Sequence, residues 1–153
     1  MKNERIEALT KFLAFQNETT EDETRATITG EGYTANEFET EDGDYLVLTD
    51  GEADTRAIDS IKNDLWAFNS DFIVEHMKGY FTMTAHETEA VTKALQEMQS
   101  KLCENANALV YALIEDIDEF VSDAIDADGR GHFISWYDGD EHEQDGFYIY
   151  RTN

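Results

Sequence analysis

Basic residues are scarce in this sequence. It contains 11 Lys and Arg against 35 Asp and Glu, which gives a formal net charge of -24 over 153 residues. A small domain needs a net charge of only about 2 to 8 to stay soluble, and a larger excess destabilises the folded state by self-repulsion. Direct binding to nucleic acid or to an anionic membrane is therefore disfavoured. The acidity instead indicates a partner with a basic surface, adaptation to high salt, or binding of multivalent cations.

Cysteine and long apolar runs are scarce too. The single cysteine, Cys103, excludes an internal disulfide and favours a reducing cytoplasm. Residues 1–15 contain no continuous apolar run, so we expect neither a signal peptide nor a membrane span. Hydrophobic residues nevertheless make up 41% of the chain, which is enough to bury a core. We therefore expect one soluble, cytoplasmic domain that spans residues 1–153.

The usual motifs of catalysis and metal binding are missing as well. The sequence has no Walker, dinucleotide-binding or H-E-x-x-H pattern, and Ser135 has no nucleophile-elbow glycines around it. The acidic loops 126–131 and 138–145 could hold a cation, but neither has the ligand spacing of an EF-hand. In the second loop, Glu143 stands where that motif requires Gly. We therefore expect a protein that is not an enzyme, with no catalytic residue, no cofactor and no metal ligand.

The first third of the chain predicts a helix, a long loop and a strand. Residues 3–16 have the apolar periodicity of an amphipathic helix. Residues 17–43 mix carboxylates, Thr and Gly, and predict an acidic loop with a short strand near residues 25–29. Residues 44–48, DYLVL, are rich in strand formers and follow a Gly. They are the first segment that clearly predicts a strand.

Capping residues mark three helix starts after this strand. Two have the Thr-x-x-Glu spacing of a capping box, in which the Thr side chain accepts a bond from a helical amide and the Glu side chain returns one. The third has Asn69 or Ser70 as the cap residue. The predicted helices cover residues 50–68 after Thr49, residues 70–77 after Asn69, and a long segment that begins at Ala85 after Thr84.

The stretch from Glu104 to Asp128 separates apolar from acidic residues most cleanly. At 100° per residue, the two kinds of side chain fall on opposite sides of a helix. Because no Gly or Pro occurs between Ala85 and Asp128, one helix of about 40 residues is predicted; a break near Asn105 and Asn107 is the competing interpretation. The apolar face holds Val110, Leu113, Ile114, Ile117, Phe120, Val121, Ala124 and Ile125, and the acidic face holds Glu115, Asp116, Asp118, Glu119, Asp123 and Asp126.

The C-terminal segment predicts a β-hairpin. Residues 132–137 and 147–151 are strand-like, and the acidic sequence DGDEHEQDG joins them. Together with residues 44–48 they would form a three-stranded antiparallel sheet. The predicted fold class is thus α+β: a mostly helical single domain with a long acidic amphipathic helix and a small antiparallel sheet that includes the C-terminal hairpin.

The stretch DGRGHFISWYDGDEHEQDGFYIYRTN, and to a smaller extent YLVLTDGEAD, resembles segments of small uncharacterised acidic proteins of tailed bacteriophages and prophages. The resemblance implies a small, soluble, acidic phage protein that acts in the cytoplasm of the host cell. The composition is also similar to that of phage DNA mimics that block restriction or CRISPR effectors. The resemblance carries no catalytic residue.

Our leading hypothesis is a DNA mimic that inhibits a basic DNA-binding protein, such as a host defence nuclease, by occupying its nucleic-acid groove. Helical carboxylates three or four residues apart stand about 5 to 6 Å from one another, which is of the same order as the phosphate spacing along a DNA strand. The six carboxylates of the acidic face would replace phosphates. The C-terminal loop is a second contact region, through Asp138, Asp140, Glu141 and Glu143.

Two alternatives remain open at this stage. The chain could be an acidic interaction or structural protein whose charge serves solubility or suits high salt. It could also be a metal-binding module or a small metal-dependent enzyme. The sequence leaves open the identity of the target and whether the protein forms a homodimer.

Overall fold

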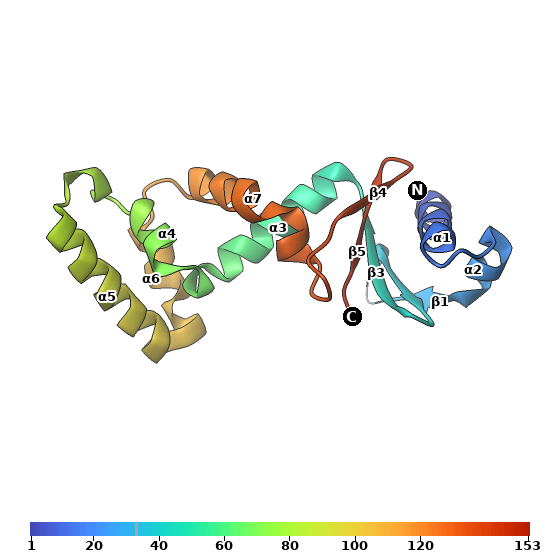
Figure 1. The fold of residues 1–153 in the computed structure, drawn as a ribbon, viewed down its shortest axis with the longest axis horizontal. Helices are drawn as coiled ribbons and strands as arrows, with labels where there is room; N and C mark the ends of the chain where they lie inside the picture. The colour runs from blue at the N-terminus through green and yellow to red at the C-terminus, as the bar shows by residue number, and fades with distance from the viewer. Residues whose placement is uncertain (33) are drawn as a thin grey trace. The chain divides into compact units, whose positions relative to one another are not determined.

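The computed structural model describes residues 1–32 and 34–153. The chain divides into two compact units. We call Met1–Ala57 with Asp128–Asn153 the sheet unit, and Ile58–Ala127 the helical unit. The fold class is α+β, with a majority of helices and a small antiparallel sheet that includes a C-terminal hairpin, as predicted (Figure 1). The prediction of a single domain stays a prediction.

The sheet unit contains five antiparallel strands in the order β1-β2-β3-β5-β4. The predicted strands at 44–48 and 147–151 are confirmed, and they pair directly, with Leu46 opposite Tyr150. The predicted strand at 132–137 is wrong, because those residues form the end of a helix and the turn after it. The strands are β1 (Ile28–Glu31), β2 (Glu37–Thr40), β3 (Gly43–Leu48), β4 (His142–Gln144) and β5 (Phe147–Arg151).

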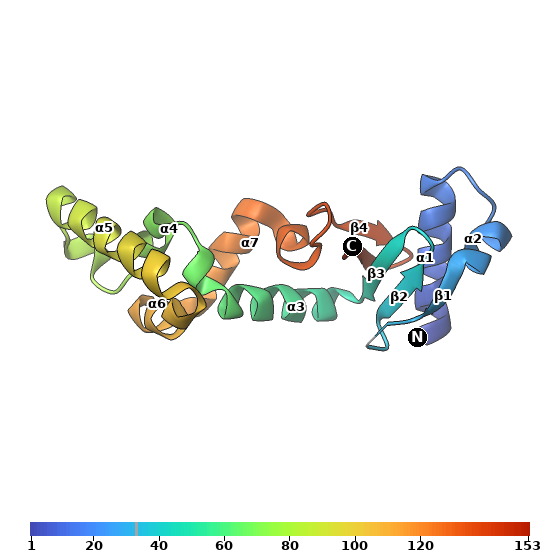
Figure 2. The ribbon, with the colours of Figure 1, turned by 90° about the horizontal axis from the view of Figure 1, so that it is seen from below.

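The first helix, α1 (Lys2–Gln16), packs on this sheet, as Figure 2 shows. The core between them consists of apolar side chains that the helical period of α1 and the strand alternation bring together. Arg5 is also buried there: its guanidinium donates to the Val47 carbonyl and to Glu52, 3.0 Å away, so its charge is paired. The buried cluster is Leu9, Leu13, Phe38, Tyr45, Val47 and Ile149.

The prediction of a long loop over residues 17–43 is wrong for most of that segment. Helix α2 (Glu21–Thr27) begins there, at a third capping box formed by Thr20 and Glu23, and β1 and β2 follow it. The Thr-x-x-Glu spacing was present in the sequence but was hidden by the many carboxylates around it. Tyr33, which also belongs to this segment, lies outside the described residues.

The capping boxes at Thr49 and Thr84 are confirmed. In each, the Glu amide donates to the Thr hydroxyl and the Glu carboxylate accepts from the Thr amide. Asn69 is confirmed as a cap through its bond from the Asp71 amide. The predicted helix ends are too late, because α3 (Asp50–Asn63) gives way to the 3-10 turn η1 (Leu65–Ala67), and α4 (Ser70–Glu75) stops before the left-handed Gly79.

One continuous helix from residue 85 to residue 128 does not form. The break near Asn105 is confirmed, and a second, unpredicted break lies at Ile114–Asp116. Asn107 fixes the first break: it accepts from the Trp66 amide at 3.1 Å and donates to the Lys62 carbonyl at 2.9 Å. The elements are α5 (Ala85–Leu102), the 3-10 turn η3 (Cys103–Ala106), α6 (Asn107–Leu113) and α7 (Ile117–Ile134), which is kinked at Gly129.

The second break is held by the backbone of residues 76–78, which follow α4. Ile114 is extended and forms an antiparallel bridge with Met77, the Lys78 amide donates to the Leu113 carbonyl, and the Glu115 amide donates to the His76 carbonyl. The predicted apolar side of α7 is confirmed, since Phe120, Val121 and Ala124 are buried. Cys103 falls at the edge of the apolar stripe of the predicted long helix, which favours a buried thiol; this prediction is wrong, because Cys103 is exposed in the turn between α5 and α6. No helix within the described residues is long and apolar enough to cross a membrane.

Candidate partner-binding surfaces

One carboxylate of the predicted acidic face, Asp116, caps the N-terminus of α7. Asp116 precedes the helix, and its Oδ1 accepts from the amides of Asp118, at 3.0 Å, and Glu119, at 3.1 Å. This is the bonding of an N-cap residue. Negative charge near a helix N-terminus is also favoured by the helix dipole. Part of the repulsion among the acidic residues is therefore offset, and Glu115 and Asp116 stand before α7, not on its face.

A surface hollow of about 540 Å³ gathers most of the predicted acidic face within the helical unit. Carboxylates from α4, from the residues before α7 and from α7 itself line it. No Lys or Arg is among the described residues that line it. We call it the acidic hollow; its lining is Glu75, His76, Met77, Tyr80, Phe81, Glu115, Asp116, Glu119 and Asp123.

His76 holds one wall of the acidic hollow in place. One ring nitrogen, Nε2, lies 3.0 Å from Asp123 Oδ2, and the other, Nδ1, lies 2.8 Å from the Phe72 carbonyl. Both neighbours are acceptors, so the two bonds form together only when the ring carries two protons. The ring also packs against Phe120, 5.1 Å away between centroids. The Asp123 carboxylate is thereby fixed although it is half exposed.

The acidic hollow also carries an aromatic residue at its rim. Phe81 follows Gly79 in a short 3-10 turn and is 93% exposed, the largest exposed fraction among the exposed large hydrophobic residues described. The Tyr80 ring, 5.4 Å away between centroids, covers only part of the Phe81 side chain. Sequence periodicity missed both Phe81 and Glu75, because they come from a segment distant in sequence from α7.

Two carboxylates of the predicted face lie elsewhere. Asp118 faces Lys62, with 3.5 Å between the charged atoms. Asp126 is exposed and does not line the acidic hollow. The structure thus brings four of the six predicted residues, Glu115, Asp116, Glu119 and Asp123, around one hollow.

The C-terminal loop contains a carboxylate that is bound internally. The Arg130 guanidinium donates to both oxygens of Glu141 at 3.0 Å, and its remaining arm donates to Asp50 at 2.8 Å and Asp54 at 2.7 Å. The Glu141 bonds raise the pKa of Arg130 further above its already high value. Burial, reinforced by Glu141, raises the pKa of the Tyr150 hydroxyl, which donates to the same carboxylate. Glu141 is therefore part of the sheet unit's own structure.

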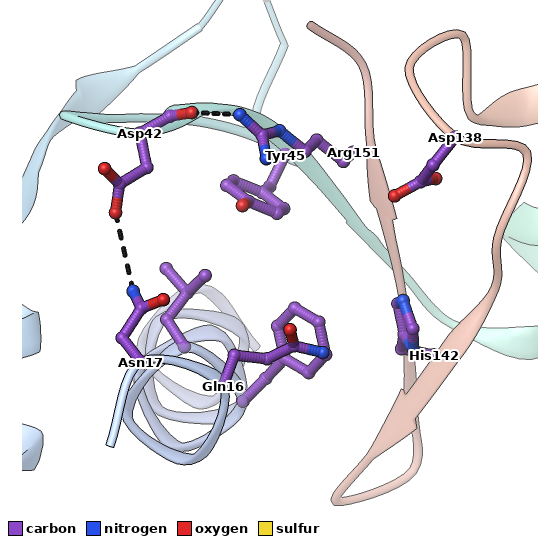
Figure 3. A pocket seen from close by; sticks show the side chains of 9 residues that line it. Gln16, Asn17, Asp42, Tyr45, Asp138, His142 and Arg151 are labelled. Atoms are coloured by element: carbon purple, nitrogen blue, oxygen red, sulfur yellow. Dashed lines mark hydrogen bonds between the residues drawn. The ribbon is translucent and has the colours of Figure 1, made fainter. Parts of the chain in front are cut away.

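Asp138, another loop carboxylate, lines a pocket of about 280 Å³. Figure 3 shows the Asp138 carboxylate and the His142 ring beside this pocket, with Arg151 and Tyr45 across it. Burial raises the pKa of Asp138, but the Asp140 amide, the Ser135 hydroxyl and the nearby His142 outweigh it and leave that pKa below its usual value. Asp140 and Glu143 are exposed.

Comparison of the chain with protein-family models, with curated proteins and with solved structures finds no match. What the protein does must therefore be argued from its surfaces. The two acidic regions offer different chemistry: a hollow in the helical unit with no Lys or Arg among its described lining residues, and a loop in the sheet unit in which Arg130 binds Glu141.

Proposed function

We propose that the protein is a non-enzymatic DNA mimic, which inhibits a basic DNA-binding protein by occupying its nucleic-acid groove. The observation that carries the proposal is the acidic hollow, where five carboxylates stand together and no Lys or Arg is among the described lining residues. The resemblance of the C-terminal segment to phage proteins favours a host defence nuclease as the target.

The physical argument starts from what a DNA groove contains. Lys and Arg in such a groove bind phosphates, and much of the affinity comes from ion release. A surface with closely spaced, fixed carboxylates can satisfy the same cations. Glu119 and Asp123, four residues apart on α7, stand about 6 Å from each other. Asp123 is held by His76 and Asp116 by the helix it caps, so less side-chain freedom is lost on binding.

The acidic hollow supports this role better than the C-terminal loop does. A carboxylate that already pairs with an internal cation offers less charge to a partner. Glu141 is bound by Arg130, and Asp138 accepts from Ser135 and from the Asp140 amide. All four loop carboxylates of the predicted set are exposed, but Asp140 and Glu143 are the two whose side chains take no part in these bonds. The exposed Phe81 adds an apolar contact that could soften the dependence of binding on salt.

The test compares two variants that remove the same charge from the same unit. The hollow variant carries Glu75→Gln, Glu115→Gln, Glu119→Gln and Asp123→Asn. The control variant carries Asp59→Asn, Asp64→Asn, Glu104→Gln and Asp126→Asn, all exposed positions outside the acidic hollow. Partners are first captured from bacterial lysate at low and high salt, and each purified partner is then tested for displacement of a labelled DNA duplex.

We expect the parent protein to displace the duplex, less so as salt rises, and the hollow variant to lose most of that activity. The control variant should retain it, and thermal melts should show that both variants are folded. If the two variants compete equally, or if the parent displaces DNA from none of its partners, phosphate mimicry is the wrong mechanism. Equal competition by both would favour an acidic surface that serves solubility or salt tolerance.

A further inference from the structure

Three possible metal ligands converge at the C-terminal loop of the sheet unit. Asp138, Asp140 and His142 each present one ligand atom, and these atoms lie within 4.8 Å of one another. Ligands around a tetrahedral zinc ion, with bonds near 2.1 Å, stand about 3.4 Å apart. The three side chains therefore need only small rotations to close on one ion.

The convergence follows from the backbone. Strand β4 begins at His142, and Asp140 lies two residues before it, which is the spacing at which side chains of an extended chain point to the same side. Asp140 and His142 share one side, while the intervening Glu141 points the other way and binds Arg130 and Tyr150. The Glu141 network thus holds the strand in the orientation that presents the other two side chains. Gly131 permits this, because a Cβ there would lie 2.3 Å from the Gly139 carbonyl.

Two of the three side chains, His142 and Asp138, are also held by contacts with their surroundings. The His142 ring packs on Phe12, with 4.9 Å between centroids. Asp138 Oδ1 accepts from the Ser135 hydroxyl at 2.7 Å and from the Asp140 amide at 3.0 Å, which leaves its second oxygen for an ion. Contacts of this kind fix the geometry of ligands in known metal sites. The adjoining pocket provides room for water ligands and a path for entry (Figure 3).

One cation, Arg151, lines the same pocket and opposes a second positive charge there. Its guanidinium is engaged elsewhere, however: it donates to the carbonyls of Asp42 and Asn153 and lies over the Tyr137 ring, 3.8 Å from the centroid. The two ligand carboxylates supply the two negative charges that a divalent ion needs.

We propose that Asp138, Asp140 and His142 bind one divalent transition-metal ion, with water in the remaining positions. The donor set selects the ion. Imidazole suits Zn²⁺ and its neighbours, whereas Ca²⁺ takes six to eight oxygen ligands and Mg²⁺ prefers oxygen. The order of affinity is therefore Zn²⁺ above Mn²⁺, and Mn²⁺ above Mg²⁺ and Ca²⁺. The proposal is independent of the DNA-mimic function, because none of its ligands lines the acidic hollow.

The experiment is calorimetric titration of the full chain, freed of metal, with Zn²⁺. Asp140→Asn and His142→Gln should each weaken binding by about 10-fold or more. Two matched controls should change it by no more than about twofold: Glu143→Gln removes one charge from the same strand, and His132→Gln removes an exposed imidazole outside the set. The metal-free variants should melt like the parent, and the His142 ring signals should shift on adding Zn²⁺.

Several results would overturn the proposal. These are no saturable Zn²⁺ binding, a loss in Glu143→Gln as large as in Asp140→Asn, a loss in His132→Gln as large as in His142→Gln, or tighter binding of Ca²⁺ than of Zn²⁺. Asp138 is left out of the decisive set because its bonds to Ser135 and Asp140 also order the loop. A substitution of Asp138 would therefore change both the metal affinity and the structure of the loop.

Discussion

The acidic loop of the sheet unit and the acidic hollow of the helical unit are both rich in Asp and Glu but use their carboxylates differently. In the sheet unit, Arg130 gathers Asp50, Asp54 and Glu141, so these charges hold distant segments of the chain together. In the helical unit, Glu115 and Glu119 face a hollow with no Lys or Arg among its described lining residues. The comparison teaches that density of negative charge does not identify a binding surface. An internal Lys or Arg that already binds the carboxylates leaves less of their charge for a partner.

The largest expected effect tests whether the two units are energetically separate. Phe120→Ala removes a fully buried ring from the helical unit and should cost about 3 to 5 kcal/mol of unfolding free energy. Trp66 and Trp136 lie one in each unit, so their indole NMR signals report the units separately during urea unfolding. A single domain predicts that both signals move together to lower urea. Movement of the Trp66 signal alone would show that the units unfold independently.

The next effect concerns the internal cation. Arg130→Met leaves three carboxylates around a position where the guanidinium was 13% exposed. Because those carboxylates are partly solvated, we expect a loss of about 2 kcal/mol, below the cost of breaking a fully buried pair. Urea unfolding, followed at Trp136, measures it. Lys62→Met removes the more exposed cation facing Asp118 in the helical unit and should cost no more than about 0.5 kcal/mol. Equal losses would mean that Arg130 contributes no more to stability than a cation in an ordinary surface pair.

Capping offers a comparison of the same substitution in both units. Thr84→Ala should cost about 1 kcal/mol, because it removes the bond to the Glu87 amide. Thr49→Ala should cost more, because Glu52, its partner in the capping box, also binds the buried Arg5. Chemical denaturation of the two variants decides. A smaller loss for Thr49→Ala would mean that Arg5 does not depend on the capping box.

Acid should weaken the sheet unit through Glu52. Burial raises the pKa of Glu52, but its bonds from Thr49 and Arg5 outweigh this and hold that pKa below its ordinary value of 4.5. A carboxyl with a lowered folded pKa gives stability that is complete above the unfolded pKa and lost as the pH falls through the folded one. We expect the urea concentration at the unfolding midpoint, followed at Trp136, to decrease once the pH is lowered below about 4.5. The Glu52→Gln variant should show a smaller decrease. An unchanged pH profile in the variant would exclude Glu52 as the cause.

Local signals in the sequence predicted much of the fold. Capping boxes, the α1 periodicity and the strands at 44–48 and 147–151 depend on neighbouring residues, and the structure confirms them. The break at Ile114 could not be predicted in this way, because it depends on a bridge to Met77, far away in sequence. Residues 132–137 have the composition of a strand, but α7 resumes after Gly129 and includes the first three of them.

The sequence predicted only part of the lining of the acidic hollow. Helical phase grouped Glu119 with Asp123, and the structure places both at the acidic hollow. It could not add Glu75 or Phe81, which reach the same hollow from an element that no periodic pattern links to α7. Nor could it find that Glu141 binds Arg130, or that Asp138 and Asp140 converge with His142.

The main-chain bridge between Met77 and Ile114, which we call the backbone clip, bears on how the charge of the acidic hollow can be altered. The carbonyl of His76 and the amide of Glu115 belong to residues on its two walls, and main-chain bonds join them whatever side chains those positions carry. The shape of the acidic hollow therefore does not depend on the sign of the charges that line it. Replacing the surrounding carboxylates with lysines at Glu75, Glu115 and Glu119 would leave the clip intact and turn the same scaffold into a receptor for anions.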